Sequence, residues 1–233
     1  MAGALRVLFH VHTRYSADAW IKPEEILRHA LAHNIGMVIV TDHDSHEGAA
    51  ACARVSEGTA VTCPLAAEYR SDAGDMIATF LRTAVKTRDP LGIIQETHAQ
   101  GGLVIIPHPF QRRPFPDRVL EGADLIEIFN SRCSAEQNAR ALDAAHQLGK
   151  PGIAGADAHF VNELGLAWNE FDCQPGADPQ TILRSTPRIP HASQTTLRAI
   201  RNSQLLKAAR EFRAIMAAKQ LVRMLQAGPT KTP

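Results

Sequence analysis

The sequence has little that would assign it to a membrane, secreted or redox-active class of protein. No uninterrupted apolar run approaches the roughly 18 residues of a membrane-spanning helix, and the opening stretch MAGALRVLF is too short for the apolar part of a signal peptide. The four cysteines are widely separated and form no CxxC pair, which argues against a structural zinc module and a redox dithiol. We therefore expect a cytoplasmic protein with reduced, mostly buried thiols.

The composition is that of one globular domain with a short appendage. The 233 residues are 45% hydrophobic, enough to bury a single large core, which excludes a disordered chain and a disulfide-stapled mini-protein. The charge is uneven, because residues 195–233 hold eight Lys and Arg against the single acidic residue Glu211, a net of +7, whereas residues 1–194 carry −6. We predict a globular domain over residues 1–194 and a basic helical tail over residues 195–233.

Short apolar or β-branched runs alternate with helical patterns along the globular part. The candidate strands lie at residues 6–10, 37–41, 60–67, 76–81, 103–106, 125–129 and 153–155. Helices are predicted to begin near Pro23, Pro90 and Ala135, whereas residues 174–194, with four prolines, indicate an irregular connector. The alternation is typical of a parallel sheet with crossover helices and predicts an α/β fold, either a barrel or a doubly wound sheet.

Residues 195–226 contain neither glycine nor proline and predict one long helix. Apolar residues recur in it at seven-residue spacing, but Lys219 interrupts one series, so fewer than three clean heptads remain. We predict an amphipathic helix that packs on the globular domain or on a partner, which includes a second copy of the chain, rather than an independent coiled coil.

Histidines and carboxylates follow the predicted strands at their C-terminal ends. They are His10, His12, Asp42, His43, Glu68, His108, Asp157 and His159. In parallel βα folds these strand ends share one rim, where reacting groups converge. Alternate residues of a strand point to one face, so His10 and His12 can bind one metal ion. Mixed nitrogen and oxygen ligands without thiolate suit Mn²⁺, Fe²⁺ or Zn²⁺.

These motifs occur in a recognisable order. The order is His10-Val11-His12-Thr13, Thr41-Asp42-His43, Glu68, Pro107-His108-Pro109 and Gly155-Ala156-Asp157-Ala158-His159. Over roughly residues 6–172 the sequence resembles the PHP (polymerase and histidinol phosphatase) superfamily. The resemblance implies a distorted (β/α)7 TIM-like barrel with two or three divalent metal ions at the strand ends, which hydrolyses phosphate esters.

The resemblance also implies which residues hold the metal ions. In that scheme a first ion is held by His10, His12, Glu68 and Asp157, a second by Glu68, Asp75 and His108, and a third by Asp18, His43 and His159. Asp75 departs from the family pattern, in which most members have a histidine. Asp75 is therefore either a ligand that makes the second site more negative or a solvated aspartate of a turn over residues 71–75.

Three residues are candidates for a catalytic role in addition to metal binding. Asp42 is positioned to orient the neighbouring His43. His43 or His159 is alternatively the acid that protonates the leaving group, because one imidazole nitrogen cannot bind a metal ion and donate a proton at the same time.

Several other polar residues flank the motifs. Arg112 and Arg113 either bind a substrate phosphate in bidentate fashion or are solvated loop residues. Arg14, Tyr15 and His46 are weaker candidates for contact with the substrate. Asn130, at the end of a predicted strand, either reaches the rim or caps the next segment.

The leading functional hypothesis is a metal-dependent phosphoesterase that acts on a small phosphorylated metabolite or nucleotide. One alternative is an amidohydrolase-type hydrolase, although no predicted strand ends in the lysine that such enzymes use as a bridge, so Glu68 would have to replace it. A second alternative is a nuclease-like protein acting on oligonucleotides, because the tail is basic, but its charges are spread around the helix. A third is an inactive, metal-stabilised interaction module. No membrane partner is expected.

Overall fold

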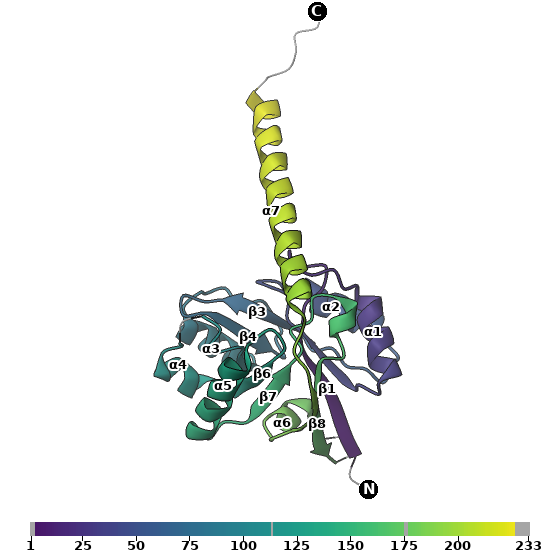
Figure 1. Cartoon of the computed structure of the whole chain (residues 1–233), viewed down its shortest axis with the longest axis vertical. Coiled ribbons are helices and arrows are strands. Elements are labelled where there is room, and N and C mark those ends of the chain that lie inside the picture. Colours follow the sequence, from purple (N-terminus) through teal and green to yellow (C-terminus); the bar gives the residue numbers. More distant parts are fainter. Residues whose placement is uncertain (1–2, 113, 175–176, 227–233) are drawn as a thin grey trace, which may run out of the picture.

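The computed structural model describes residues 3–112, 114–174 and 177–226, whose strands form two sheets (Figure 1). In the first sheet the order is β2 (Met37–Val40), β1 (Gly3–Val11), β8 (Ala167–Cys173) and β9 (Arg188–Ala192). In the second sheet it is β3 (Ala66–Arg70), β4 (Asp75–Thr79), β5 (Leu103–Ile106), β6 (Leu125–Asn130) and β7 (Gly152–Gly155).

The predicted helices are α1 (Pro23–Ala32), α3 (Pro90–Ala99), α5 (Ala135–Gln147) and α7 (Leu197–Gln226), and each begins within two residues of its predicted position. The described residues also form α2 (Glu47–Val55), α4 (Asp117–Gly122), α6 (Pro179–Leu183) and a short 3-10 helix at Val161–Glu163, which the sequence pattern did not predict. Local chemistry explains two of the starts. The Asp89 carboxylate accepts a hydrogen bond from the Gly92 N–H at 2.7 Å, and Ser134 and Gln137 form a capping box.

The mixed α/β class is confirmed, but the described residues form two sheets rather than a clearly closed (β/α)7 barrel. The reason is strand direction: β3 and β5 both run antiparallel to β4, and β8 runs antiparallel to β1. Single bridges connect the two sheets: Val11 at the end of β1 pairs with Ala158, which follows β7, and His43, which follows β2, pairs with Glu68 of β3. The sheets therefore approach each other at the end where the candidate ligands lie.

Two predicted segments differ from the structure. The expected strand over residues 60–67 begins only at Ala66, because Pro64 has no N–H for a strand ladder and Thr62 forms just a single bridge. The expected connector over residues 174–194 contains α6 and β9, and β9 pairs with β8, a strand that the sequence pattern did not predict.

Three apolar clusters hold the layers together. One lies on the five-stranded sheet and includes residues of α3, α4 and α5, and another joins β1 and β2 to α1 and α2. The third contains residues of both sheets, among them Phe9, Ile77 and Phe171, which are at most 1% exposed. Burial of such a side chain contributes about 1.5–3 kcal/mol. The packed layers fix the strand ends that carry the candidate ligands.

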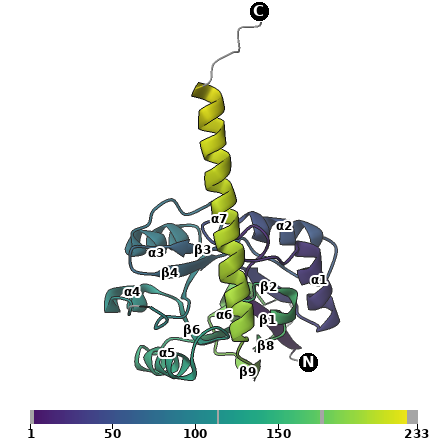
Figure 2. The ribbon, with the colours of Figure 1, turned by 45° about the horizontal axis from the view of Figure 1, so that its top comes forward.

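Helix α7 contacts the globular domain through its first turns and then extends away from it (Figure 2). Ala199 and Ser203 are buried, whereas Phe212, Ile215 and Met216 are about half exposed or more. A single long helix was predicted here, and the structure has one. Across the described part of the chain, no helix combines the length and apolar character needed to cross a membrane.

Candidate metal centre

Eight of the nine predicted ligands gather at one end of the two sheets. Ligand atoms within 4.8 Å of one another occur in three groups: His12 with His43 and His159, His10 with His12 and Asp157, and His10 with Glu68 and His108. Asp18 completes the set, because its carboxylate oxygens lie 3.3 Å from His43 Nε2 and 3.7 Å from His159 Nε2. The structure therefore concentrates imidazoles and carboxylates in the way that the strand-end pattern predicts.

Glu68 lies at the centre of this group. Its carboxylate oxygens are 2.9 Å from His43 Nδ1 and 3.1 Å from His108 Nε2. They are also 3.6 Å from the Nε2 atoms of both His10 and His12. Glu68 is in the middle of β3 rather than at its end, which corrects the predicted position. A carboxylate among four imidazoles is well placed to contact more than one cation.

The backbone turns sharply at three of the candidate ligands. His10 has a φ of 63°, His108 of 31° and Asp157 of 46°, which are left-handed values that residues with a side chain rarely adopt. At His10 the register of β1 against β2 shifts, as at a β-bulge. The imidazole centroids of His10 and His12 are 5.2 Å apart. The HxH pair therefore converges through a bulge, not through the simple strand alternation that we expected.

Glu127 orients one of these imidazoles, and the sequence analysis did not assign it a role. Its carboxylate accepts hydrogen bonds from His10 Nδ1 and from the backbone N–H of His108, both at 2.7 Å. Asn130 Nδ2 donates to the same carboxylate at 2.9 Å and to Asp157 at 3.2 Å, so Asn130 does reach the site. Because Nδ1 of His10 is held by Glu127, its Nε2 is left to face Glu68 and Asp157. The signal in the sequence was an acidic residue within an apolar strand.

Asp42 acts on a different set of groups from the one predicted. Its carboxylate accepts hydrogen bonds from the Thr13 N–H at 2.7 Å and from the Thr13 and Ser16 hydroxyls at 2.6 Å. Ser16 in turn accepts from the His43 N–H at 3.1 Å and lies 3.4 Å from His12 Nδ1. Among the described residues no hydrogen bond joins Asp42 to the His43 imidazole itself. Asp42 therefore fixes the loop that carries the ligands.

The buried polar atoms of the centre fit a divalent cation. His10 Nε2, His12 Nε2 and Asp18 Oδ1 are buried and have no hydrogen-bond partner among the described residues. Each such atom costs about 1–3 kcal/mol when it is left unpaired. Imidazole nitrogens and carboxylate oxygens are the donor atoms that Mn²⁺, Fe²⁺ and Zn²⁺ accept.

The electrostatics of the centre favour positive charge beside its carboxylates. Burial opposes a charged His43, but the Glu68 and Asp18 carboxylates outweigh it and raise the pKa of His43 to about 10. Burial and the neighbouring His159 instead lower the pKa of His12 to about 3, so His12 is neutral and ready to act as a ligand. Without metal, carboxylates keep protons on imidazoles that a cation would displace.

Asp75, the unusual ligand of the predicted set, lies outside the three groups of ligand atoms. It is the first residue of β4, and its side chain is 11% exposed. It lines a cavity together with Glu68 and His108, and one carboxylate oxygen is 3.9 Å from Arg112 Nη1. Burial and the nearby Glu68 raise the pKa of Asp75. Its part in binding metal stays a prediction.

The other predicted residues divide by location. Arg112 lines a cavity of about 430 Å³ that also contains the His43 and His159 side chains. Arg113 lies outside the described residues. Arg14 is exposed, and its guanidinium is 5.8 Å from the ring of Tyr15, which is 38% exposed. His46 is the residue before α2.

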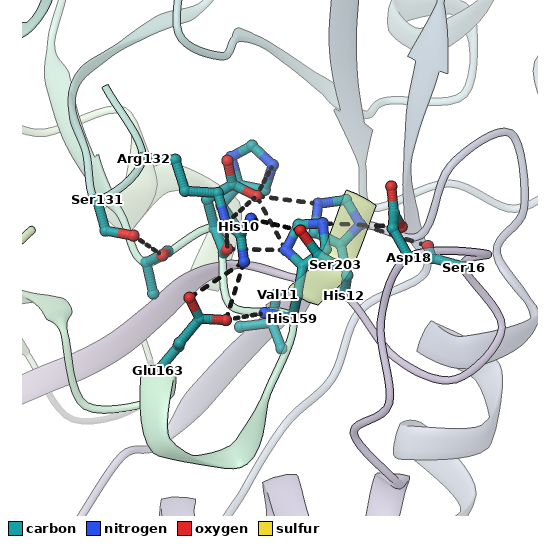
Figure 3. Close-up of polar contacts among 12 residues, drawn as sticks. His10, Val11, His12, Ser16, Asp18, Ser131, Arg132, His159, Glu163 and Ser203 are labelled. Carbon is teal, nitrogen blue, oxygen red and sulfur yellow. Dashed lines mark hydrogen bonds and ion pairs between the residues drawn. The ribbon is translucent and has the colours of Figure 1, made fainter. Parts of the chain in front are cut away.

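A second unpredicted group, Arg132 and Glu163, braces the segment that carries Asp157 and His159 (Figure 3). Arg132 Nε donates to the Asp157 backbone oxygen at 2.8 Å, and Nη2 donates to both Glu163 oxygens at 2.9 and 3.1 Å. Glu163 also accepts from the His159 N–H at 2.9 Å. Arg132 Nη1 reaches Ser203 of α7 at 2.9 Å. The Arg132 guanidinium thus positions the segment that carries Asp157 and His159.

The sequence is similar to one protein family and to two proteins of one organism. The family model described as PHP-associated matches residues 135–186. The uncharacterized protein MJ1587 of Methanocaldococcus jannaschii is 29% identical over 136 residues, which cover 52% of this chain and 80% of that protein. The uncharacterized protein MJ0417 of the same organism is 34% identical over 116 residues, 45% of this chain and about half (49%) of that protein.

A solved structure extends the comparison to most of the fold. It is a two-domain protein from Bacteroides vulgatus described as containing a predicted PHP-like metal-dependent phosphoesterase, with a TM-score of 0.70 and 15% identity over 82% of this chain and 66% of that one. At this identity the likeness concerns the fold. The mixed α/β fold is similar to that of PHP-like proteins, and the described residues include groups of imidazoles and carboxylates that could hold metal ions. The family model over residues 135–186 and this likeness in fold support membership of the PHP superfamily.

Proposed function

We propose that the protein is a metal-dependent hydrolase of phosphate esters, with a small phosphorylated metabolite or nucleotide as substrate. One observation carries the proposal: the buried Glu68 carboxylate lies within 3.6 Å of four imidazoles, two of which, His10 and His12, have unpartnered Nε2 atoms. A bound cation would give these buried, unpartnered atoms the partner that they otherwise lack.

The residues that would hold the ions are those of the three described groups, with Asp18 and Asp75 as further carboxylate ligands. Two or three bound Mn²⁺, Fe²⁺ or Zn²⁺ ions would supply Lewis acidity, which lowers the pKa of water and offsets the charge of phosphate oxygens. The chain's own groups then orient and exchange protons. Glu127 holds His10, and Ser16 and Asp42 hold the loop of His12, so that the ligand atoms are fixed before the substrate binds.

A proton donor for the leaving oxygen is also available in the cavity. His43 and His159 both line it, and each has its Nε2 within 3.7 Å of Asp18. Whichever of the two does not ligate metal during the reaction can hold a proton beside this carboxylate and deliver it to the departing alkoxide.

The test combines elemental analysis with a hydrolysis screen over phosphomonoesters, nucleotides, a phosphodiester, short oligonucleotides and an amide substrate. We expect the protein as purified to contain at least two metal ions, to lose phosphomonoesterase activity on chelation and to regain it with Mn²⁺, Fe²⁺ or Zn²⁺. His12→Ala should lower activity strongly, whereas the matched control His146→Ala, on the exposed side of α5, should not change it. Full activity in metal-free protein would contradict the proposal. Amide or oligonucleotide hydrolysis alone would favour the alternatives.

A further inference from the structure

The first turns of α7 form part of the wall of the cavity that contains the candidate ligands. Ile200, Ser203, Gln204 and Lys207 line the same space of about 430 Å³ as Asp18, His43 and His159. The basic helix, separated from these ligands by more than thirty residues of sequence, is therefore part of the site. Figures 1 and 2 show α7 rising from the globular domain.

Contacts on both sides of Lys207 hold the helix over the cavity. One turn before it, the Ser203 hydroxyl accepts a hydrogen bond from Arg132 Nη1 at 2.9 Å. One turn after it, Arg210 Nη1 donates to the backbone oxygens of Ser16 at 2.7 Å and Ala19 at 3.1 Å. The Arg210 guanidinium also lies 5.1 Å from the centroid of the Trp20 ring. These contacts connect α7 to the loop that carries Asp18, and they position Lys207 without using its ammonium group.

The Lys207 ammonium points to a carboxylate that the site needs for another purpose. Its Nζ is 3.7 Å from Asp18 Oδ2, and the side chain is 34% exposed. The same carboxylate faces His43 and His159. If Asp18 binds a divalent cation, as the proposed function requires, the ammonium and the cation repel each other at short range. An anion that lies between the Lys207 ammonium and the cation offsets this repulsion, because it is attracted to both.

We infer that Lys207 is a substrate-binding residue, whose ammonium binds a non-bridging oxygen of a terminal phosphoryl group. This inference rests on the proposed function and narrows its substrates to phosphate monoesters, since a doubly charged phosphoryl group best matches a cation cluster faced by an ammonium. The cavity size fits the range of about 300–1,000 Å³ for small-molecule sites. A neighbouring cavity of about 480 Å³, which shares Asp75, His108 and Arg112 and is also lined by Phe115, offers room for the organic leaving group.

The experiment measures binding of inorganic phosphate to Mn²⁺-loaded full-length protein by titration calorimetry. Lys207→Met keeps the length of the side chain and removes its charge, and we expect it to weaken phosphate binding by about tenfold or more. Lys207→Arg should retain most of the affinity. Lys219→Met, an exposed lysine on the same helix, is the matched control and should bind phosphate as the wild type does.

Metal content is measured in the same preparations. Wild-type metal stoichiometry in Lys207→Met, together with weak phosphate binding, supports the inference. Unchanged phosphate affinity in Lys207→Met overturns it, and an additional bound ion in that variant would then show that the ammonium only occupies a cation position at Asp18. Lys207→Arg is the variant that changes the side chain but keeps its charge. If it also loses phosphate binding, the charge of Lys207 does not explain the binding, and the inference is overturned.

The outcome separates this inference from the proposed function. If wild-type protein hydrolyses no monoester but binds phosphate in a Lys207-dependent way, the proposed function fails and the binding site stands. If wild-type protein hydrolyses monoesters and Lys207→Met changes neither KM nor phosphate affinity, the function stands and the role of Lys207 is refuted.

Discussion

Replacing Glu127 by Gln is the sharpest test of whether Glu127 orients the ligands His10 and His108. The variant keeps the shape of the side chain, but one acceptor oxygen becomes an amide NH₂ group. The native carboxylate accepts from three donors, namely His10 Nδ1, the His108 N–H and Asn130 Nδ2, at 2.7, 2.7 and 2.9 Å. Whichever way the amide is turned, its NH₂ group therefore faces a donor.

Both orientations weaken metal binding. If the NH₂ group faces His10, the imidazole must accept at Nδ1 and carry its proton on Nε2, the atom that faces Glu68 and Asp157. If the oxygen faces His10, the NH₂ group opposes the His108 N–H and displaces a second ligand. Loss of such an orienting partner costs about 10–100-fold in metal affinity, or about 1.4–2.7 kcal/mol.

The assay titrates chelator-stripped protein with Mn²⁺ and Zn²⁺ against a competing chelator. The matched control is Asp124→Asn, because Asp124 is also a largely buried carboxylate that lies 2.8 Å from a histidine nitrogen, His98 Nε2, but outside the metal centre. We expect Asp124→Asn to bind metal as the wild type does. Wild-type metal affinity in a folded Glu127→Gln variant would refute the orienting role.

Three further predictions concern the ligands themselves. Metal loading should release protons at pH values below about 10, because His43 is charged below its raised pKa of about 10 and must be neutral to bind metal; metal affinity should thus rise as the pH increases towards 10, and binding enthalpies that do not depend on the buffer would contradict it. Glu68→Gln should lower activity more than His12→Ala, and a milder loss of phosphoesterase rate would count against a bridging carboxylate. Asp75→Asn should reduce metal stoichiometry and Asp75→His should shift preference from Mn²⁺ towards Zn²⁺, whereas unchanged metal content and rate in both variants would remove Asp75 from the site.

The sequence predicted the centre better than the fold around it. Polar residues that follow apolar strands are conspicuous, so the convergence of His10, His108 and Asp157 could be expected from their spacing. The direction of β4 could not be expected, because antiparallel and parallel neighbours use similar apolar runs, and β8 itself was not predicted. The bulge at His10 is a backbone property that residue types alone do not reveal.

The supporting residues were harder to predict because they act on partners far away in the chain. Glu127 contacts His10 across 117 positions, and Arg210 contacts Ser16 across 194. The sequence does not show which distant residue a charged side chain in a strand or helix will contact in the folded protein. In the sequence Lys207 is one of several basic residues spread around the helix, and its approach to Asp18 is seen only in the folded structure.

The left-handed backbone at His10, His108 and Asp157 has a consequence for how the protein responds to selection. Each such conformation costs about 1–3 kcal/mol for a residue with a side chain, against a typical total stability of about 5–15 kcal/mol. Glycine at these positions would relax the metal-free chain and remove its ligands at the same step. A selection for thermally stable variants in the presence of chelator would therefore enrich variants that have lost these ligands. Only a selection in the presence of the divalent cation would retain both thermal stability and the metal-dependent activity.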